Sequence, residues 1–407
     1  MKKRYVLVLL LTSIRLCSYA QEVLTFEKAD SLLAKNIQST IDQKNVEEAR
    51  ASLQQSKNYA NPTVQWMHNI RNPTNHRWLD TGKTGEDDIQ LSQPIAIGGQ
   101  HKDVVRQNEA LLQGAKADQR LSLTERRRDL HETMIDAYTI RQKEEIIQKE
   151  IASAEEILKA YEQQTAKGNI PAMETLRIKT MLYGLKQEQT SLLLQEQALW
   201  KNIRTQTGTS LQTCSISSVN LDADLLQLSQ RLESQELSHP SVSSVVAARD
   251  ASQWTWKTEK ANALPQISLQ GEYDKNGNIG HNYFAFGASV SVPLWNHNKG
   301  NIAAARARYE QSVLAVNQLQ TKMRQQWEND YQAAITWRDA VAAQSRNFSS
   351  ELEKGIEATE TQMKHHNISV LEFVDYYSNY KDMKYQLLDA QAELLKAHEA
   401  IKYDLAE

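Results

Sequence analysis

Apolar positions along the chain change their spacing several times, and each spacing predicts a different element. Residues 89–92 alternate apolar and polar side chains, which is typical of a strand with one apolar face. From His101 to Ala166 apolar residues recur every three or four positions without a proline, which predicts one continuous helix of about 65 residues, about 100 Å long. Pro94 and Gly98-Gly99 separate the two elements, because proline has no N–H to donate and glycine permits a sharp turn.

The same order of patterns returns about 200 residues later, which indicates an internal duplication. The matched positions are Pro62 and Pro265, Pro94 and Pro293, and Asn169 and Asn367, with offsets of 203, 199 and 198 residues. We therefore expect two structural repeats, residues 21–220 and 221–407. Each should contain a half-length helix, two strands, a full-length helix and a returning helix.

Helix and strand limits follow from the same periodicity. Helices are expected at 25–58, 101–166, 172–206, 239–263 and 301–364, with a last helix reaching the C-terminus. Strands are expected at 64–70, 89–94, 267–273 and 284–292. The strand from Phe284 to Val292 has the clearest alternation, with apolar side chains at its even-numbered positions.

The strands decide between two environments. One apolar face, one small or polar face and about ten residues are typical of transmembrane β-strands, which must close into a barrel. Four strands cannot close around water, so several copies would have to combine theirs. Aromatic residues near the strand ends fit an interfacial girdle: Trp66, Trp78, Tyr273, Tyr283 and Trp295. The alternative is a water-soluble sheet packed on helices.

The N-terminus has the pattern of an export signal, expected to cover residues 1–20. Lys2-Lys3-Arg4 precedes an apolar stretch, and Ser18-Tyr19-Ala20 offers small residues for cleavage. The residues before Cys17 fit a lipidation motif poorly. After cleavage Cys214 is the only cysteine left, so no internal disulfide is expected.

Composition and motifs argue against several classes of function. The formal net charge of −3 is unlike that of a nucleic-acid binder. The sequence has no phosphate-binding loop, no metal-ligand spacing of Cys and His, and no nucleophile elbow. We therefore expect no enzyme, no cofactor and no bound metal, and look for conduction, gating and docking.

The layout resembles the TolC-type outer-membrane efflux proteins over nearly all of the mature chain. The residues that carry the resemblance are Gln93-Pro94 with Gly98-Gly99, Val292-Pro293-Leu294, and the turn from Lys167 to Glu174. It implies a mainly α fold with a small transmembrane β part: a homotrimer whose twelve-stranded β-barrel is continued by a long α-helical barrel. The chain would lie in lipid of the cell outer membrane and extend into the periplasm. The compact size and short inter-strand loops lean toward the CzcC/CusC-like heavy-metal branch.

The resemblance also implies functional residues at the helix turns. Acidic residues after the turns would ring the closed entrance as a gate: Glu174 in the first repeat, and Glu372 and Asp375 in the second. The alternative is that these acids only complement the helix dipole. The turns that would dock a periplasmic adaptor comprise Lys167, Gly168 and Asn169 in the first repeat and His365, His366 and Asn367 in the second.

The second turn departs from the first. His366 occupies the position of Gly168, so Asn367 is expected to take the left-handed conformation. The adjacent histidines allow either a metal contact or a solvated turn. A stripe of tyrosines on the last helix, Tyr376, Tyr377, Tyr380 and Tyr385, is expected to pack inside a coiled coil.

The function that this resemblance implies is a passive exit duct of a tripartite efflux system. A periplasmic adaptor would join the duct to an inner-membrane pump, and the cargo would be metal cations or small toxic compounds. One alternative is the exit duct of a type I polypeptide secretion system. Another is a periplasmic coiled-coil adaptor or scaffold, which would need a small β-barrel or lipoyl-like domain that the sequence does not show.

Overall fold

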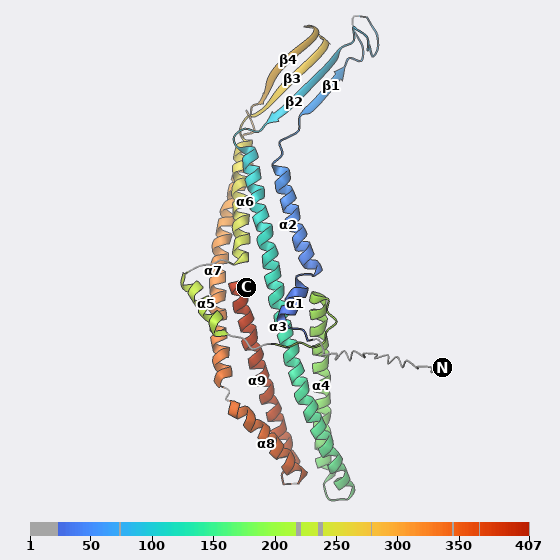
Figure 1. The fold of residues 1–407 in the computed structure, drawn as a ribbon, viewed down its shortest axis with the longest axis vertical. Helices are drawn as coiled ribbons and strands as arrows, with labels where there is room; N and C mark the ends of the chain where they lie inside the picture. Colours follow the sequence, from blue (N-terminus) through green and yellow to red (C-terminus); the bar gives the residue numbers. More distant parts are fainter. Residues whose placement is uncertain are drawn as a thin grey trace, which may run out of the picture. The chain divides into compact units, whose positions relative to one another are not determined.

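The computed structural model describes residues 23–72, 75–216, 221–234, 239–277, 279–343, 346–365 and 367–406. The expected signal peptide (residues 1–20), Cys17 and His366 lie outside the described residues. The rest of the chain is mainly helical with a small sheet (Figure 1). The mainly α fold with a small β part is therefore confirmed.

The two halves of the chain show the same order of elements. The first half contains α1 (Phe26–Leu33), α2 (Ile37–Ser56), β1 (Thr63–His68), β2 (Asp87–Ile95), α3 (Gln100–Ala166) and α4 (Ala172–Thr207). The second contains α5 (Leu221–Ser234), α6 (Pro240–Asn262), β3 (Gln266–Gly277), β4 (Gly280–Ser291), α7 (Lys299–Ala343), α8 (Arg346–Lys364) and α9 (Val370–Leu405). The repeat limits 21–220 and 221–407 stay a prediction.

Two expected helices are each described as two segments. The predicted helix 25–58 is divided into α1 and α2, because Asn36 caps α2 and its Oδ1 accepts a hydrogen bond from the Gln38 N–H at 3.1 Å. The predicted helix 301–364 is divided into α7 and α8, with residues 344 and 345 outside the described part. The sequence therefore overestimated the continuity of the first of these helices, and the continuity of the second stays a prediction.

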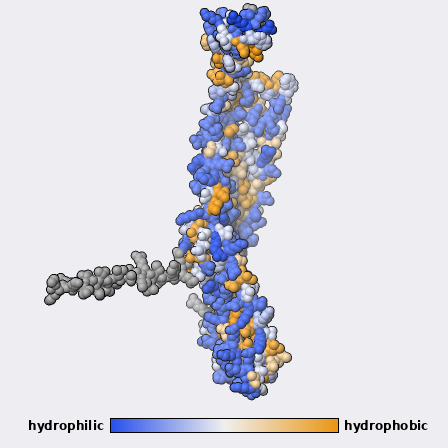
Figure 2. Space-filling model, turned by 90° about the vertical axis from the view of Figure 1, so that its right-hand side faces the viewer, coloured by the Kyte–Doolittle hydropathy of each residue, from blue (hydrophilic) through white to orange (hydrophobic). Residues whose placement is uncertain are grey.

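The chain forms two compact units that cut across the repeats. The helical unit comprises Met1–Ala34, Asp129–Val219 and Trp337–Lys396, and the sheet unit comprises Lys35–Arg128, Asn220–Thr336 and Ala397–Glu407. Each unit thus combines segments from both halves of the sequence. Figure 2 shows that most of the surface in its view is hydrophilic, with apolar side chains in separate patches along the helices.

Coiled-coil packing holds the helical unit together. Spacings of three and four residues place two groups of side chains in its core. One group is Ile147, Ile151, Ala154, Leu182, Leu185 and Leu192; the other is Ile157, Tyr161, Ile178, Ile356, Met363, Val370, Phe373 and Tyr377. Tyr376, Tyr380 and Tyr385 pack against these groups, so the predicted packing of the tyrosine stripe is confirmed.

The sheet unit contains all four described strands, in the order β1-β2-β3-β4, with every neighbouring pair antiparallel. Gly98 and Gly99 have positive φ of 67° and 82°, which confirms the predicted turn before α3. Glycine is favoured at position 98 because of this positive φ, and a Cβ there would also displace the end of the Leu264 side chain. Pro94 does not end β2 as predicted, since β2 continues to Ile95, but β1 pairs only as far as Ser92.

Candidate functional site

One face of the sheet is apolar. Residues paired directly across antiparallel strands share a face, so the register defines rows. The first two rows are Trp66, Ile89, Tyr273 and Phe284, and then Val64, Leu91, Gly271 and Phe286; a further row is Ile95, Ile267 and Val290. Phe284 is 74% exposed and Phe286 is 80% exposed, so this part of the apolar face is uncovered within the described residues. The exposure favours the transmembrane alternative over a sheet packed on helices of the same chain.

The opposite face is polar or small. Its rows are Gln65, Gln90, Glu272 and Ala285; Ser92, Gln270 and Gly287; and Ser268 and Ser289. The even-numbered residues of β4 thus share the apolar face, and the odd-numbered residues share the polar one. A sheet with these two faces can separate an apolar phase from water.

Both edges of this sheet lack a partner within the described residues. β1 pairs only with β2, and β4 pairs only with β3. Open edges expose a row of backbone N–H and C=O groups that can pair with another chain. Because all pairs are antiparallel, β1 and β4 run in opposite directions. The β4 edge of one copy can therefore continue as an antiparallel pair with the β1 edge of the next.

The loop between β1 and β2 is organised around Asp80. Its carboxylate accepts hydrogen bonds from Thr84 Oγ1 at 2.7 Å, from Asn75 Nδ2 at 2.6 Å and from the Gly82 N–H at 3.1 Å. These hydrogen bonds lower the pKa of Asp80 to about 2, and the bond from Thr84 has the largest effect.

Trp78 of this loop is 70% exposed, and Trp295 after β4 is 92% exposed. Both remain available for an interfacial girdle.

The first helix turn is a Schellman motif in the helical unit. Gly168 has φ of +77°, and its N–H donates to Thr165 O at 2.9 Å. The Asn169 N–H donates to Gln164 O at 3.0 Å, which completes the motif. Lys167, Gly168 and Asn169 are all exposed. The turn is thus rigid and accessible, which a docking surface requires.

The second turn closes with the matching bond. The Asn367 N–H donates to Gln362 O at 2.9 Å, and both His365 and Asn367 are exposed. The left-handed conformation expected of Asn367 stays a prediction. The predictions for His366 concern a residue outside the described part of the chain.

The two turns border a common cavity of about 500 Å³ within the helical unit. Asn169 and Ile170 line it from the first turn, and Ile368 and Ser369 line it from the second. Glu174 also lines this cavity, where its Oε1 accepts a hydrogen bond from Arg177 at 3.4 Å. The structure therefore brings the predicted docking turns and one predicted gate acid together.

Glu372 and Asp375 do not line this cavity but lie just after the second turn, in the first turns of α9. Glu372 forms a capping box: its Oε2 accepts from the Ser369 N–H at 2.9 Å, and Ser369 Oγ accepts from the Glu372 N–H at 3.2 Å. The bonds from Ser369 lower the pKa of Glu372. Both acids are exposed, and Asp375 accepts a hydrogen bond from Asn379 at 3.4 Å. In the single chain Glu372 therefore caps α9, and the gate role of Glu372 and Asp375 stays a prediction.

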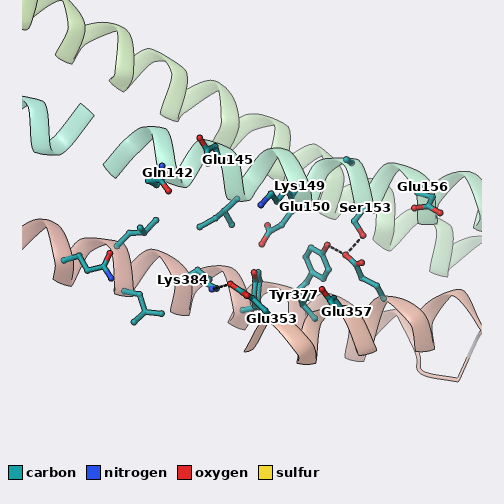
Figure 3. A pocket seen from close by; sticks show the side chains of 18 of the residues that line it. Gln142, Glu145, Lys149, Glu150, Ser153, Glu156, Glu353, Glu357, Tyr377 and Lys384 are labelled. Atoms are coloured by element: carbon teal, nitrogen blue, oxygen red, sulfur yellow. Dashed lines mark hydrogen bonds and ion pairs between the residues drawn. The ribbon is translucent and has the colours of Figure 1, made fainter. Parts of the chain in front are cut away.

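Sequence reasoning missed a larger cavity of the helical unit. It has a volume of about 1040 Å³ and is lined by α3, α8 and α9, together with Val341 of α7 (Figure 3). Glu150 lines it and is only 3% exposed. A signal was present in the sequence, because Glu150 falls between Ile147 and Ala154 at a spacing that places it beside the apolar stripe.

No group of three or more His, Cys, Asp or Glu side chains in the described part of the chain could hold a metal ion. Within the same residues, no helix combines the length and apolar character needed to cross a bilayer.

Residues 232–403 match the family model described as outer membrane efflux protein. A comparison with curated proteins finds no match. The matched stretch includes all of α6, both strands of the second half, α7, α8 and most of α9. It therefore includes the sheet edge formed by β4 and the turn before α9.

Solved structures share the fold over most of the chain. The outer-membrane channel OprN matches with a TM-score of 0.77 and 13% identity, covering 94% of this chain and 89% of its own. CusC, described as forming a transmembrane channel, gives 0.74 and 15%, covering 93% and 91%. The CmeC outer membrane channel of Campylobacter jejuni gives 0.74 and 14%, covering 94% and 85%. These values do not separate CusC from the others, so the lean to the heavy-metal branch stays a prediction.

Proposed function

We propose that three copies of the chain form the outer-membrane exit duct of a tripartite efflux system, since residues 232–403 match the outer membrane efflux protein family. The family match and the shared fold of outer-membrane channels support a location in the outer membrane with a periplasmic extension. The duct is passive, and a periplasmic adaptor joins it to an inner-membrane pump. Its cargo is metal cations or small toxic compounds.

The observation that carries this proposal is the two-faced sheet with open edges. Four strands from each of three copies supply twelve antiparallel strands, and edge-to-edge pairing of β4 with β1 closes them into a barrel without an exposed edge. The apolar rows then face lipid, and the Gln, Ser and Gly rows line water.

An apolar stripe on α4 supports association of the helices as well. Met173, Leu176, Tyr183 and Leu194 recur at heptad spacing and are 54–68% exposed. Exposure of large apolar side chains to water is unfavourable, and packing such a row against a neighbouring helix lowers the free energy. In the proposed trimer a helix of the adjacent copy covers the stripe and extends the barrel as an α-helical tunnel.

The turns of the helical unit are the proposed contact with the adaptor. Lys167, Gly168 and Asn169 present a rigid exposed loop, and His365, His366 and Asn367 form its counterpart in the second repeat. The cavity between the turns offers an apolar contact through Ile170 and Ile368. Glu174, Glu372 and Asp375 are the proposed gate acids near these turns.

Neutralising the gate is expected to weaken cation block. Glu372 and Asp375 lie three residues apart on one helix face, and threefold symmetry would put six carboxylates around the entrance. The double variant Glu372→Gln/Asp375→Asn should be blocked less readily by a trivalent cation added on the periplasmic side. Single-channel conductance in planar bilayers, with and without the cation, measures this effect.

The matched control is Glu162→Gln, which changes an exposed acid on α3 near the first turn. It should be blocked like the parent. Equal block of the double variant and the parent would contradict the gate assignment. A parent chain that forms no channel at all would contradict the duct itself.

The structure bears differently on the two alternative functions, the coiled-coil adaptor and the polypeptide exit duct. The adaptor or scaffold reading gains no support, because the only sheet in the described residues is the four-stranded one, and it is neither a small barrel nor a lipoyl-like domain. The exit duct of a type I polypeptide secretion system shares the proposed architecture. The inner-membrane partner recovered with the chain distinguishes it from an efflux duct.

A further inference from the structure

The large cavity of the helical unit has an acidic lining. Six carboxylates surround it: Glu145, Glu150, Glu156, Glu353, Glu357 and Glu360. The cationic side chains on its wall are Lys149 and Lys384. The cavity therefore has an excess of negative charge, and its volume of about 1040 Å³ is that of a site for a drug-sized molecule.

Three of these six carboxylates already have side-chain partners. Lys384 Nζ donates to Glu353 at 2.8 Å, and Lys364 pairs with Glu156 at 2.9 Å. Tyr377 Oη and Ser153 Oγ both donate to Glu360 Oε1 at 2.6 Å (Figure 3). These groups form a fixed polar wall that does not require a ligand.

Glu150 is different. It is 3% exposed, and neither of its carboxylate oxygens has a hydrogen-bond partner within the described part of the chain. It points from α3 into the space in front of α9 (Figure 3). Lys381 is the cation that lowers the pKa of Glu150, but its Nζ donates a hydrogen bond to Glu188 at 2.6 Å. A buried carboxylate without a partner is costly, and a cation in the cavity would offset that cost.

The remaining wall suits the apolar part of such a cation. Tyr377 and Tyr380 present aromatic rings, and Lys384 Nζ already lies 5.8 Å from the centroid of the Tyr380 ring. Ile356 and Leu388 add aliphatic surface. A divalent metal fits poorly, because no group of three ligating side chains exists among the described residues.

We propose that this cavity binds an amphiphilic organic cation, with Glu150 as the anion that pairs with its charge and with Tyr377 and Tyr380 contacting its apolar body. The site is additional to the duct, since conduction through a barrel does not need a ligand in the helical wall. Its test measures equilibrium binding, so the outcome is independent of whether the duct proposal holds.

Binding should be linked to proton release. Burial, with Glu188 and Asp382 adding repulsion and Lys381 opposing it, raises the pKa of Glu150 to about 8. Tyr377, Tyr380 and Tyr385 also face this carboxylate, together with the lining acids and lysines. At pH 6 the acid is protonated and must lose its proton when the cation binds. Affinity is therefore expected to rise with pH up to about 8 and then level off.

The experiment is a fluorescence titration of the detergent-purified full-length protein with ethidium, a planar organic cation. The parent should bind it saturably, with one site per chain, and more tightly at pH 8 than at pH 6. Glu150→Gln keeps the shape and removes the charge, so it should weaken binding at least tenfold at pH 8 and abolish the pH dependence. The matched control Glu155→Gln changes an exposed acid of α3 that pairs with Lys186 outside the cavity, and should stay within twofold of the parent.

Three results would overturn the proposal, and a fourth would count against it. They are no saturable ethidium binding by the parent between pH 6 and 9, equal affinity of Glu150→Gln and the parent, and displacement of ethidium by micromolar Mg²⁺. The last would identify a metal site instead of a site for an organic cation. Loss of affinity in Glu155→Gln equal to that in Glu150→Gln would also count against it, because bulk surface charge would then explain the binding.

Discussion

Phe286→Arg is expected to prevent stable assembly of the protein in the outer membrane. Phe286 lies in the middle of β4 on the apolar face, in the row of Val64 and Leu91. An arginine on the lipid face near the bilayer midplane costs roughly 2–4 kcal/mol, and three copies would contribute this cost to one barrel. The amount of heat-modifiable trimer in outer-membrane fractions measures the effect, which should be near-complete loss.

Ser289→Arg is the matched control. Ser289 lies on the same strand but in the polar row with Ser268, so an arginine there would point into water. This variant should assemble normally and shift the ion selectivity of the channel toward anions. Normal assembly of Phe286→Arg, or loss of assembly only in Ser289→Arg, would mean that the faces of the sheet are reversed.

Glu150→Gln is expected to stabilise the helical unit at neutral and alkaline pH. The folded-state pKa of about 8 lies above the ordinary glutamate value of 4.5, so the folded state holds a proton that the unfolded state loses. Stability should therefore fall as pH rises from about 4.5 to 8 and be constant above that window. The cost at pH 7 is on the order of 3 kcal/mol, and glutamine removes it.

Thermal melting of the helical circular dichroism signal at pH 5, 7 and 9 tests this prediction. The difference in melting temperature between Glu150→Gln and the parent should be small at pH 5 and large at pH 9. Glu155→Gln, an exposed control, should follow the parent at every pH. A parent whose stability does not change relative to Glu150→Gln across this range would show that Glu150 has an ordinary pKa.

Periodicity predicted the long regular elements well. The limits of α3 and α4 differ from the expected ones by one residue, because three-to-four spacing over tens of residues leaves no alternative. The strand faces were equally predictable, since a period of two fixes the side of each residue. Short elements were less predictable. Helix α5 was not expected, because its only buried apolar positions are Leu221, Leu225 and Leu228.

The candidate site was predictable in part. The glycine turn at Gly168 followed from sequence, and so could the capping box, because Ser369 precedes Glu372 by the three residues that the motif requires. The second turn closes with the same backbone bond as the first, from the Asn367 N–H to Gln362 O, although a histidine stands at the position of Gly168. Glu150 could be noticed as an acid beside an apolar stripe, but its missing partner depends on α9 and α4, which are distant in sequence.

The most direct test of the central claim is the mass of the detergent-extracted protein by analytical ultracentrifugation, with circular dichroism of the same sample. The claim is that the open edges of β1 and β4 pair between copies and close a twelve-stranded barrel. The account predicts a species of three chains that keeps its β-structure, and loses that structure when it dissociates. A stable single chain with intact β-structure would contradict it.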